Sequence, residues 1–236
     1  MELIIDEKIR EKYPDLRIAV VAAENVNNVD YSPDFKSFIT GIFREFACKF
    51  DSQSDFENHK NIRAWRDIYR SFGINPKKKK PTAESFLIRI IRNNHISCIN
   101  PAVDAYLCAE TAYYLPIGGY DLTKITGNIT LKLADGTEHF LGVGADTEET
   151  VIDSEVVYAD ESRILTRCWN YRDCDFSKIN TETKKLAFFS EAPLLVISDD
   201  EVKNTINQVA ENLKRFCEAE CKVLFLSASQ NELVLL

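Results

Sequence analysis

A short, strongly basic segment contains the residues whose types and spacing most directly indicate chemistry. Residues 59–92 hold ten Lys or Arg and only two acids, whereas the whole chain of 236 residues has a formal charge of −8. Such a separation of charge is typical of a protein that presents one face to a polyanion while the rest stays soluble. We expect that polyanion to be the phosphate backbone of RNA or DNA. The predicted contact residues are Arg63, Arg66, Arg70, Lys77, Lys78, Lys79, Lys80, Arg89 and Arg92.

Two predicted helices and the loop between them must position these charges. Residues 57–72 show apolar positions at helical spacing, and three of the arginines fall on one stripe beside that apolar face. Lys77–Lys80 lie between Pro76 and Pro81, which prevent a continuous helix and predict an exposed, stiff loop. The next helix is expected over 82–93. The alternative interpretation is an ordinary solvated loop whose charges pair with the acidic remainder of the chain.

The rest of the chain has the pattern of an α+β protein. From residue 127 the apolar period changes to two, and a turn at Asp135-Gly136 predicts a hairpin between 128–133 and 137–143. No linker rich in Gly, Pro or Ser divides the chain, so we expect one domain over residues 1–236. The other predicted helices are 34–50, 100–114 and 199–218, and the other predicted strands are 16–23, 156–159, 164–169, 186–198 and 222–227, with a last apolar stretch at 233–236.

Cysteine and histidine spacing argues against a disulfide framework and against a zinc site. The seven cysteines form no C-x-x-C pair, and we expect them to be reduced and mostly buried. His59, His95 and His139 are not at ligand spacing from one another or from a cysteine, so we expect no metal and no cofactor. No apolar run reaches about 18 residues, which predicts a cytoplasmic protein without a membrane span.

Five short motifs occur in a recognisable order. They are Trp65-Arg66-x-x-Tyr69-x-x-Phe72-Gly73-x-x-Pro76, Pro81-Thr82-x-Glu84, Ile99-Asn100-Pro101-x-Val103-Asp104-Ala105-Tyr106, Gly119-Tyr120-Asp121-Leu122 and Val156-Val157-Tyr158-Ala159-Asp160. Their series resembles the tRNA-editing domain of the bacterial phenylalanyl-tRNA synthetase beta subunit, in its free-standing form. The resemblance covers about residues 7–189 and leaves the last helix and strand, within 199–236, unaccounted for. It implies a layered α+β fold in which mixed β-sheets are flanked by helices.

The resemblance also implies an activity and a partner. In the synthetase this domain hydrolyses tyrosine wrongly esterified to the phenylalanine tRNA, because a primary site rejects one additional hydroxyl group imperfectly. None of the aminoacylation machinery is visible in this sequence. We therefore expect an aminoacyl-tRNA as the partner, and proofreading in trans, with the tyrosyl ester on phenylalanine tRNA as the leading substrate.

The matching motifs supply the candidate site residues. Ester hydrolysis requires a positioned water, donors that face the developing oxyanion and a group that recognises the substrate ammonium. Arg167 and Arg172 carry guanidinium groups that can hold a carboxylate or phosphate bidentately. The predicted catalytic residues are Glu148, which is preferred for the pocket acid, Asp104 and Asp121, and the predicted substrate pocket consists of Asn100, Tyr120, Glu138, Arg167, Asn170 and Arg172.

Departures from the family pattern leave two other classes of function open. Leu107 stands where free-standing relatives tend to have Asn, Cys168 replaces an Arg, and Tyr171 replaces a Trp. The apolar Leu107 favours a non-catalytic RNA-binding module as one alternative, and a protein that binds a free amino acid or amide is the other. Asp104 and Asp121 also have a simpler interpretation, as residues that cap a helix or close a turn.

Overall fold

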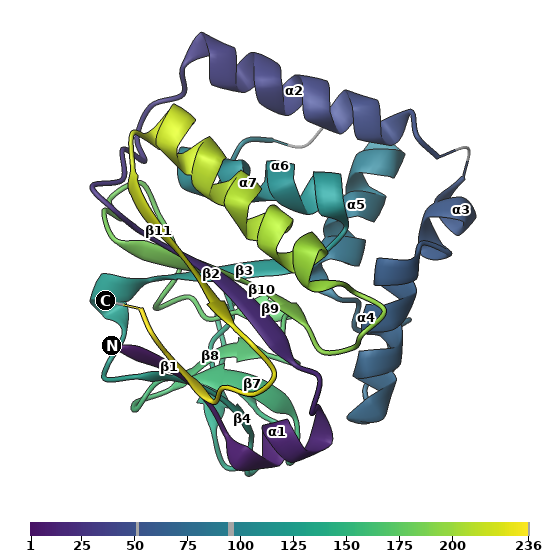
Figure 1. Ribbon diagram of the computed structural model, residues 1–236, viewed down its shortest axis with the longest axis vertical. Helices are drawn as coiled ribbons and strands as arrows, with labels where there is room; N and C mark the ends of the chain where they lie inside the picture. The colour runs from purple at the N-terminus through teal and green to yellow at the C-terminus, as the bar shows by residue number, and fades with distance from the viewer. Residues whose placement is uncertain (51, 94–96, 236) are drawn as a thin grey trace.

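Two β-sheets lie one above the other, and helices cover the outer face of one of them (Figure 1). The structure is a computed structural model that describes residues 1–50, 52–93 and 97–235. The sheet beneath the helices, sheet B, has four antiparallel strands. They are, in spatial order, β11 (Glu220–Leu226), β2 (Arg17–Glu24), β10 (Leu186–Ala192) and β3 (Ile117–Asp121).

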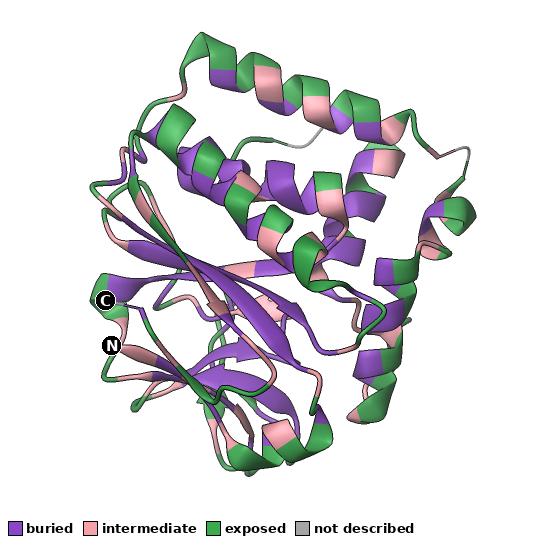
Figure 2. Cartoon of the chain, viewed as in Figure 1, coloured by how far each residue is buried: buried purple, intermediate pink, exposed green. Residues whose placement is uncertain are grey.

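The central strands of sheet B are covered on both faces. Every residue of β10 and all but the last residue of β2 are buried (Figure 2). A strand buried on both faces has a continuous apolar sequence, which explains the apolar runs at 16–23 and 186–192; the strand expected at 186–198 ends at Ala192, and Leu195 and Val196 beyond it are exposed.

Sheet A contains six strands and is mixed. Strands β1 and β4 run parallel, and all other neighbours run antiparallel. The segment after residue 219 joins both sheets, because its first strand pairs in sheet B and its second in sheet A. The strands of sheet A are, in spatial order, β12 (Glu232–Val234), β1 (Glu2–Ile5), β4 (Ile129–Leu133), β7 (Val156–Ala159), β8 (Ile164–Arg167) and β9 (Arg172–Asp173).

The helices begin at residues that satisfy free backbone amides. Asn100 caps the helix that starts at Pro101, and Ser198 forms a capping box with Glu201. The helices are α1 (Glu7–Lys12), α2 (Pro33–Ala47), α3 (Gln53–Glu57), α4 (Lys60–Ser71), α5 (Thr82–Asn93), α6 (Pro101–Tyr113) and α7 (Asp199–Cys217), with a short 3-10 turn, η1, at Leu122–Lys124. Helix α7 packs on β2, β10 and β11, while α6 lies against α7 and is covered by α2 (Figure 1). The predicted α+β class is therefore confirmed, and the helix expected at 57–72 is present as α4, which begins at Lys60, while Glu57 belongs to α3.

The prediction of a hairpin around Asp135 and Gly136 is wrong. Strand β4 pairs instead with β1 and β7, and the following segment forms a separate two-stranded sheet of β5 (His139–Phe140) and β6 (Glu149–Thr150). The turn closes on a side chain, because Glu138 Oε2 accepts hydrogen bonds from the backbone N–H groups of Asp135 (3.0 Å) and Gly136 (3.1 Å). Lys132 Nζ lies 2.9 Å from the other carboxylate oxygen of Glu138. The turn is thus closed by the side chain of Glu138, which is bonded to Lys132 of β4, and residues 137–143 form no strand paired with β4.

No helix in the described part of the chain combines the length and the apolar composition that a membrane span requires.

Candidate functional site

A small cavity lies between the two sheets. It has a volume of about 50 Å³ and is lined by β3 and β10 of sheet B and by β7, β8 and β9 of sheet A. We call it the inter-sheet cavity. It brings together three of the predicted pocket residues, Tyr120, Asn170 and Arg172. Its complete lining is Thr82, Tyr106, Ile117, Gly118, Tyr120, Tyr158, Thr166, Trp169, Asn170, Tyr171, Arg172, Asp173, Phe189 and Glu191.

Two carboxyl groups that the sequence reasoning missed line this cavity. Glu191 is 3% exposed, and its Oε1 accepts a hydrogen bond of 2.6 Å from the hydroxyl of Tyr158. Burial raises the pKa of Glu191 to about 8 and the pKa of Asp173 to about 6. At neutral pH, Glu191 is therefore mainly protonated and Asp173 mainly ionised. Two carboxyl groups in different protonation states are typical of sites that bind or transfer protons.

A chain of hydrogen bonds holds Asp173 in place. The hydroxyl of Thr166 donates to Asp173 Oδ1 at 2.6 Å and lies 2.6 Å from the hydroxyl of Tyr120. Gly118 lies on the opposite sheet, where a Cβ atom would be 3.8 Å from the same carboxylate oxygen. The absence of a side chain at Gly118 therefore leaves open the space in front of Asp173.

The tight turn between β8 and β9 forms one end of the cavity and is conformationally strained. Cys168 and Trp169 have φ angles of 46° and 68°, a left-handed conformation that costs bulky residues about 1–3 kcal/mol each. The turn is held by Glu155, which accepts hydrogen bonds from the guanidinium of Arg167 (2.9 and 2.8 Å) and from the backbone N–H of Cys168 (2.9 Å). Burial alone would raise the pKa of Glu155, but these bonds hold it below the ordinary value. The ion pair between Glu155 and Arg167 thus stabilises the strained conformation of the turn.

This ion pair changes the interpretation of Arg167. Its guanidinium is bound to Glu155 and also lies 2.7 Å from Glu149 Oε2. Arg167 therefore stabilises the turn and has no free guanidinium edge for a substrate. The same turn makes Cys168 a poor nucleophile, because burial raises the pKa of its thiol to about 12.

Three buried polar atoms of the cavity-lining residues have no hydrogen-bond partner within the described part of the chain. They are Trp169 Nε1, Asn170 Nδ2 and Glu191 Oε2. Asn170 is oriented by its other amide atom, since its Oδ1 accepts a hydrogen bond of 2.8 Å from the hydroxyl of Tyr69. A buried polar atom without a partner costs about 1–3 kcal/mol. Their grouping is typical of a site that is completed by a ligand or water.

The lysine loop, residues 77–80, lies directly beside this turn. Lys79 Nζ is 3.8 Å from Cys168 Sγ and 5.6 Å from the centre of the Tyr171 ring. After the loop, the backbone N–H of Thr82 donates to the carbonyl oxygen of Asn170 at 3.2 Å. Lys77 and Lys78 are exposed. The loop thus places ammonium groups next to a wall of the inter-sheet cavity.

Two of the three predicted arginines on α4, Arg66 and Arg70, are engaged in internal contacts. Arg66 forms two hydrogen bonds, of 2.8 and 2.7 Å, with the buried Glu84 and lies 3.0 Å from Glu57. Lys80 lies 3.6 Å from the same Glu84 carboxylate. Arg66 is therefore a structural residue rather than a free phosphate ligand. In addition, Arg70 pairs with Asp67 and Arg92 donates to Gln53. The predicted basic residues without an ion pair in the described structure are Arg63, Lys77, Lys78, Lys79, Arg89 and Arg92, of which Arg92 donates to the neutral Gln53.

Two of the predicted site residues lie at the start of α6, where Asn100 is the cap and Asp104 belongs to the first turn. Asn100 Oδ1 accepts a hydrogen bond from the backbone N–H of Val103 at 3.0 Å. Asp104, in the first turn, accepts hydrogen bonds from the hydroxyl of Tyr31 and from the backbone N–H of Ile99. Burial raises the pKa of Asp104, although these bonds oppose the change. Neither residue lines the inter-sheet cavity.

Asp121 closes a turn. Its Oδ1 accepts hydrogen bonds from the backbone N–H and the hydroxyl of Thr123, at 2.9 and 2.6 Å, and its Oδ2 accepts one from Thr183 at 2.8 Å. Both carboxylate oxygens are therefore occupied. The simpler interpretation, a residue that closes a turn, describes Asp121 as the structure places it.

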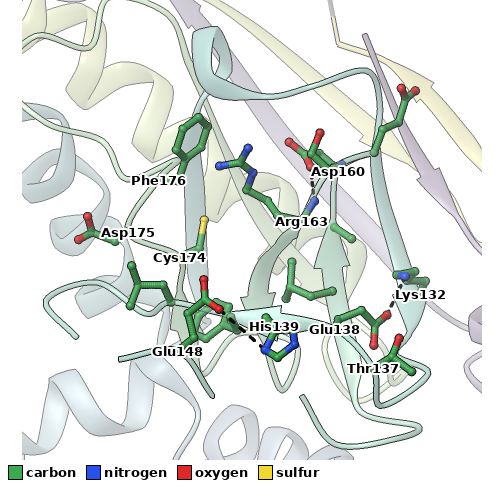
Figure 3. A pocket seen from close by; sticks show the side chains of 16 residues that line it. Lys132, Thr137, Glu138, His139, Glu148, Asp160, Arg163, Cys174, Asp175 and Phe176 are labelled. Carbon is green, nitrogen blue, oxygen red and sulfur yellow. Dashed lines mark hydrogen bonds and ion pairs between the residues drawn. The ribbon is translucent and has the colours of Figure 1, made fainter. Parts of the chain in front are cut away.

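Glu148 and Glu138 line a different cavity, which is open and has a volume of about 680 Å³ (Figure 3). Glu148 is exposed and points toward His139, with 3.8 Å between Oε2 and Nδ1, and Glu138 is paired with Lys132. Cys174 lines this open cavity whereas its neighbour Asp173 lines the inter-sheet cavity, so the chain at β9 separates the two. The structure thus divides the predicted site residues between the two cavities, the ion pair of Arg167 with Glu155, the start of α6 and the turn that Asp121 closes.

His139 lines the open cavity, and no described histidine lines the inter-sheet cavity. His59 caps α4 through its side chain, and His139 is exposed; His95 lies outside the described residues. Within residues 1–50, 52–93 and 97–235, no group of three or more His, Cys, Asp or Glu side chains is arranged to hold a metal ion.

Comparison with known proteins gives one family match and a distant structural likeness. A family model described as the B3/4 domain matches residues 64–218, a range that begins and ends later than the 7–189 of the sequence resemblance. No curated protein matches the chain. One similar solved structure is an N-terminal fragment of the phenylalanyl-tRNA synthetase beta subunit from Pyrococcus horikoshii, with 14% sequence identity and a TM-score of 0.47. The alignment covers 93% of this chain and 49% of that one, so this chain spans about half the length of the fragment.

Proposed function

Because this chain belongs to the B3/4 domain family, the editing-type domain of phenylalanyl-tRNA synthetase beta subunits, we propose that it hydrolyses aminoacyl-tRNA in trans. Membership of the family confirms the resemblance inferred from the sequence and indicates a function related to tRNA. The finer proposal is that the lysine loop holds the phosphates near the acceptor end while the inter-sheet cavity receives the aminoacyl group. We treat residues 1–236 as one domain in this proposal.

One observation carries the proposal: a loop of ammonium groups adjoins a polar cavity that contains unpartnered buried atoms. Lys79 contacts the turn that carries Trp169 and Asn170, and both of these residues have an unpartnered nitrogen atom. An aminoacyl-tRNA has the matching chemistry, because it joins an anionic backbone to an ester carbonyl and an ammonium group. Arg172 also lines the cavity; its guanidinium donates to the carbonyl oxygen of Val143 at 3.2 Å and has no ion pair in the described structure.

The residues of the cavity supply each element that ester hydrolysis requires. In the proposed reaction, water attacks the ester carbonyl carbon, the bond to the ribose oxygen breaks, and the ribose hydroxyl and the free amino acid are released. Asp173, ionised at neutral pH, accepts the proton of the water, and Asn170 Nδ2 donates to the developing oxyanion. Glu191 accepts a hydrogen bond from the substrate ammonium, whose positive charge favours the ionised carboxylate.

The test is deacylation of tRNA charged with a wrong amino acid, followed at moderate salt with the purified protein. Asp173→Asn is expected to slow cleavage by at least about 100-fold, the usual contribution of a general base. Glu148→Gln is the matched control, since Glu148 is exposed in the open cavity. If Glu148→Gln abolishes cleavage while Asp173→Asn does not, the site is the open cavity and this assignment is refuted.

The lysine loop is tested separately from the cavity. Replacing Lys77, Lys78 and Lys79 by Ala is expected to weaken tRNA binding, with a shallower dependence on salt, because fewer counterions are released. Cleavage of a minimal aminoacyl ester is expected to be unchanged. Equal losses in both assays would refute the division of labour between loop and cavity.

A non-catalytic tRNA-binding protein is the second candidate. Asp104 and Asp121 are two of the three acids that the sequence pattern assigned to catalysis. The carboxylates of both accept internal hydrogen bonds, which favours this second candidate. Retention of the charged tRNA without any cleavage would identify this function.

A further inference from the structure

We infer that the inter-sheet cavity selects a small aminoacyl group, of the size of glycyl, alanyl or seryl, and excludes an aromatic one. This inference rests on the proposed function. The cavity holds about 50 Å³, whereas a protein cavity that binds benzene measures about 150 Å³. On the same measure a cavity needs about 10–15 Å³ to hold one water. The cavity has about a third of the volume of one that binds a benzene ring, so it admits the amino end of an aminoacyl group with at most a small side chain and excludes the ring of a tyrosyl group.

The walls that limit the cavity are rigid aromatic side chains. Tyr120, Tyr158 and Phe189 pack on one another, with ring centres 5.6 to 6.3 Å apart, and all three are buried. The hydroxyl of Tyr120 is bonded to Thr166 and that of Tyr158 to Glu191. A rotation of either tyrosine would break a buried hydrogen bond, which costs about 1–3 kcal/mol. Movement of the tyrosines within the two sheets would therefore widen the cavity only at the free-energy cost of a buried hydrogen bond.

Among the aromatic side chains that line the cavity, that of Tyr106 in α6 can be truncated with the smallest loss of stability. It is partly exposed, its ring centre is 4.9 Å from that of Phe188, and its hydroxyl has no hydrogen bond in the described structure. Tyr106→Ala is thus expected to enlarge the cavity while the two sheets stay in place. Tyr106→Phe keeps the ring and is the matched control.

The groups that remain free in the cavity suit the core of an aminoacyl ester. The cavity-lining residues hold two unpartnered N–H donors, on Trp169 and Asn170, which suit an ester carbonyl oxygen, and one unpartnered oxygen, on Glu191, which suits one N–H of an ammonium group. A large side chain would need more space than the volume of about 50 Å³ that the cavity offers.

The experiment measures cleavage and binding side by side. Cleavage compares alanyl and tyrosyl esters on the same tRNA, and binding compares alaninamide with tyrosinamide by NMR titration. The wild type is expected to cleave the alanyl ester at least about tenfold faster and to bind alaninamide more tightly. Tyr106→Ala is expected to reduce this preference to near unity, and Tyr106→Phe to retain it.

The two measurements separate the failure of this inference from the failure of the proposed function. If the tyrosyl ester is cleaved as fast as the alanyl ester, the function stands and the size selection is refuted. If alaninamide binds selectively but no ester is cleaved, the size selection stands and the hydrolase is refuted. If neither amide binds and neither ester is cleaved, both are refuted.

Discussion

Two adjacent glycines in β3 are expected to respond in opposite ways to the same substitution. A Cβ atom on Gly119 would lie 2.3 Å from Cδ1 of Phe188 and 2.6 Å from the carbonyl oxygen of Ala187. Phe188 is fully buried, so its ring has no space into which to move. A Cβ atom on Gly118 would meet only Asp173 Oδ1, at 3.8 Å, which is an ordinary contact.

The difference in stability follows from these distances. Overpacking a buried site costs about 1–3 kcal/mol, so Gly119→Ala is expected to lower the melting temperature by roughly 2–12 °C for a chain of this size. Gly118→Ala is expected to be neutral or to stabilise the protein by up to about 1 kcal/mol, because Ala restricts the unfolded chain. Thermal unfolding of the two variants beside the wild type measures the contrast.

The same Gly118→Ala variant tests the site. Its methyl group would occupy the space in front of Asp173, so cleavage of the aminoacyl ester is expected to be lost in a fully folded protein. A Gly118→Ala protein that is as unstable as Gly119→Ala would refute the packing argument. A stable Gly118→Ala protein with wild-type cleavage would show that the reaction takes place elsewhere.

Two further predictions concern buried charge. Burial raises the pKa of both Glu191 and Glu110 to about 8, so the stability that each contributes is complete below its ordinary pKa of 4.5 and is lost as the pH rises through about 8. Urea unfolding from pH 5 to 9 should show that Glu191→Gln removes part of this decline, and identical pH profiles for variant and wild type would contradict it. Arg66→Ala leaves Glu84 buried without its main partner and is expected to cost about 3 kcal/mol, whereas the double replacement by Met is expected to recover most of that loss. Equal losses in the single and double variants, measured by urea unfolding, would show that packing rather than charge dominates at this pair.

Local signals made most elements of the fold predictable from the sequence. Helix starts were marked by residues that can cap, such as Asn100 and Ser198, and the apolar run of β2 was long enough to stand out. Strand β3 was missed because its two glycines interrupt the apolar pattern. The hairpin at Asp135 was wrong because a side chain, that of Glu138, closed the turn in place of a paired strand.

The site was less predictable, because residue type alone does not reveal orientation. Asp104 and Asp173 look alike in sequence, yet one accepts hydrogen bonds at a helix start and the other lines a cavity. Glu191 had a usable signal, since it is the single acid within the apolar run of β10. The cavity itself combines residues from both sheets, and no local pattern reports such a combination.

The segment that contains β11 and β12 has a consequence for synthesis of the protein. It covers the open edge of β2 in one sheet and of β1 in the other, although both of those strands are made near the beginning of the chain. A nascent chain that has reached only residue 219 therefore exposes two unpaired strand edges, which are templates for aggregation. Contacts between such distant segments also form slowly. We expect the growing polypeptide to depend on chaperones until residues 220–234 have emerged from the ribosome.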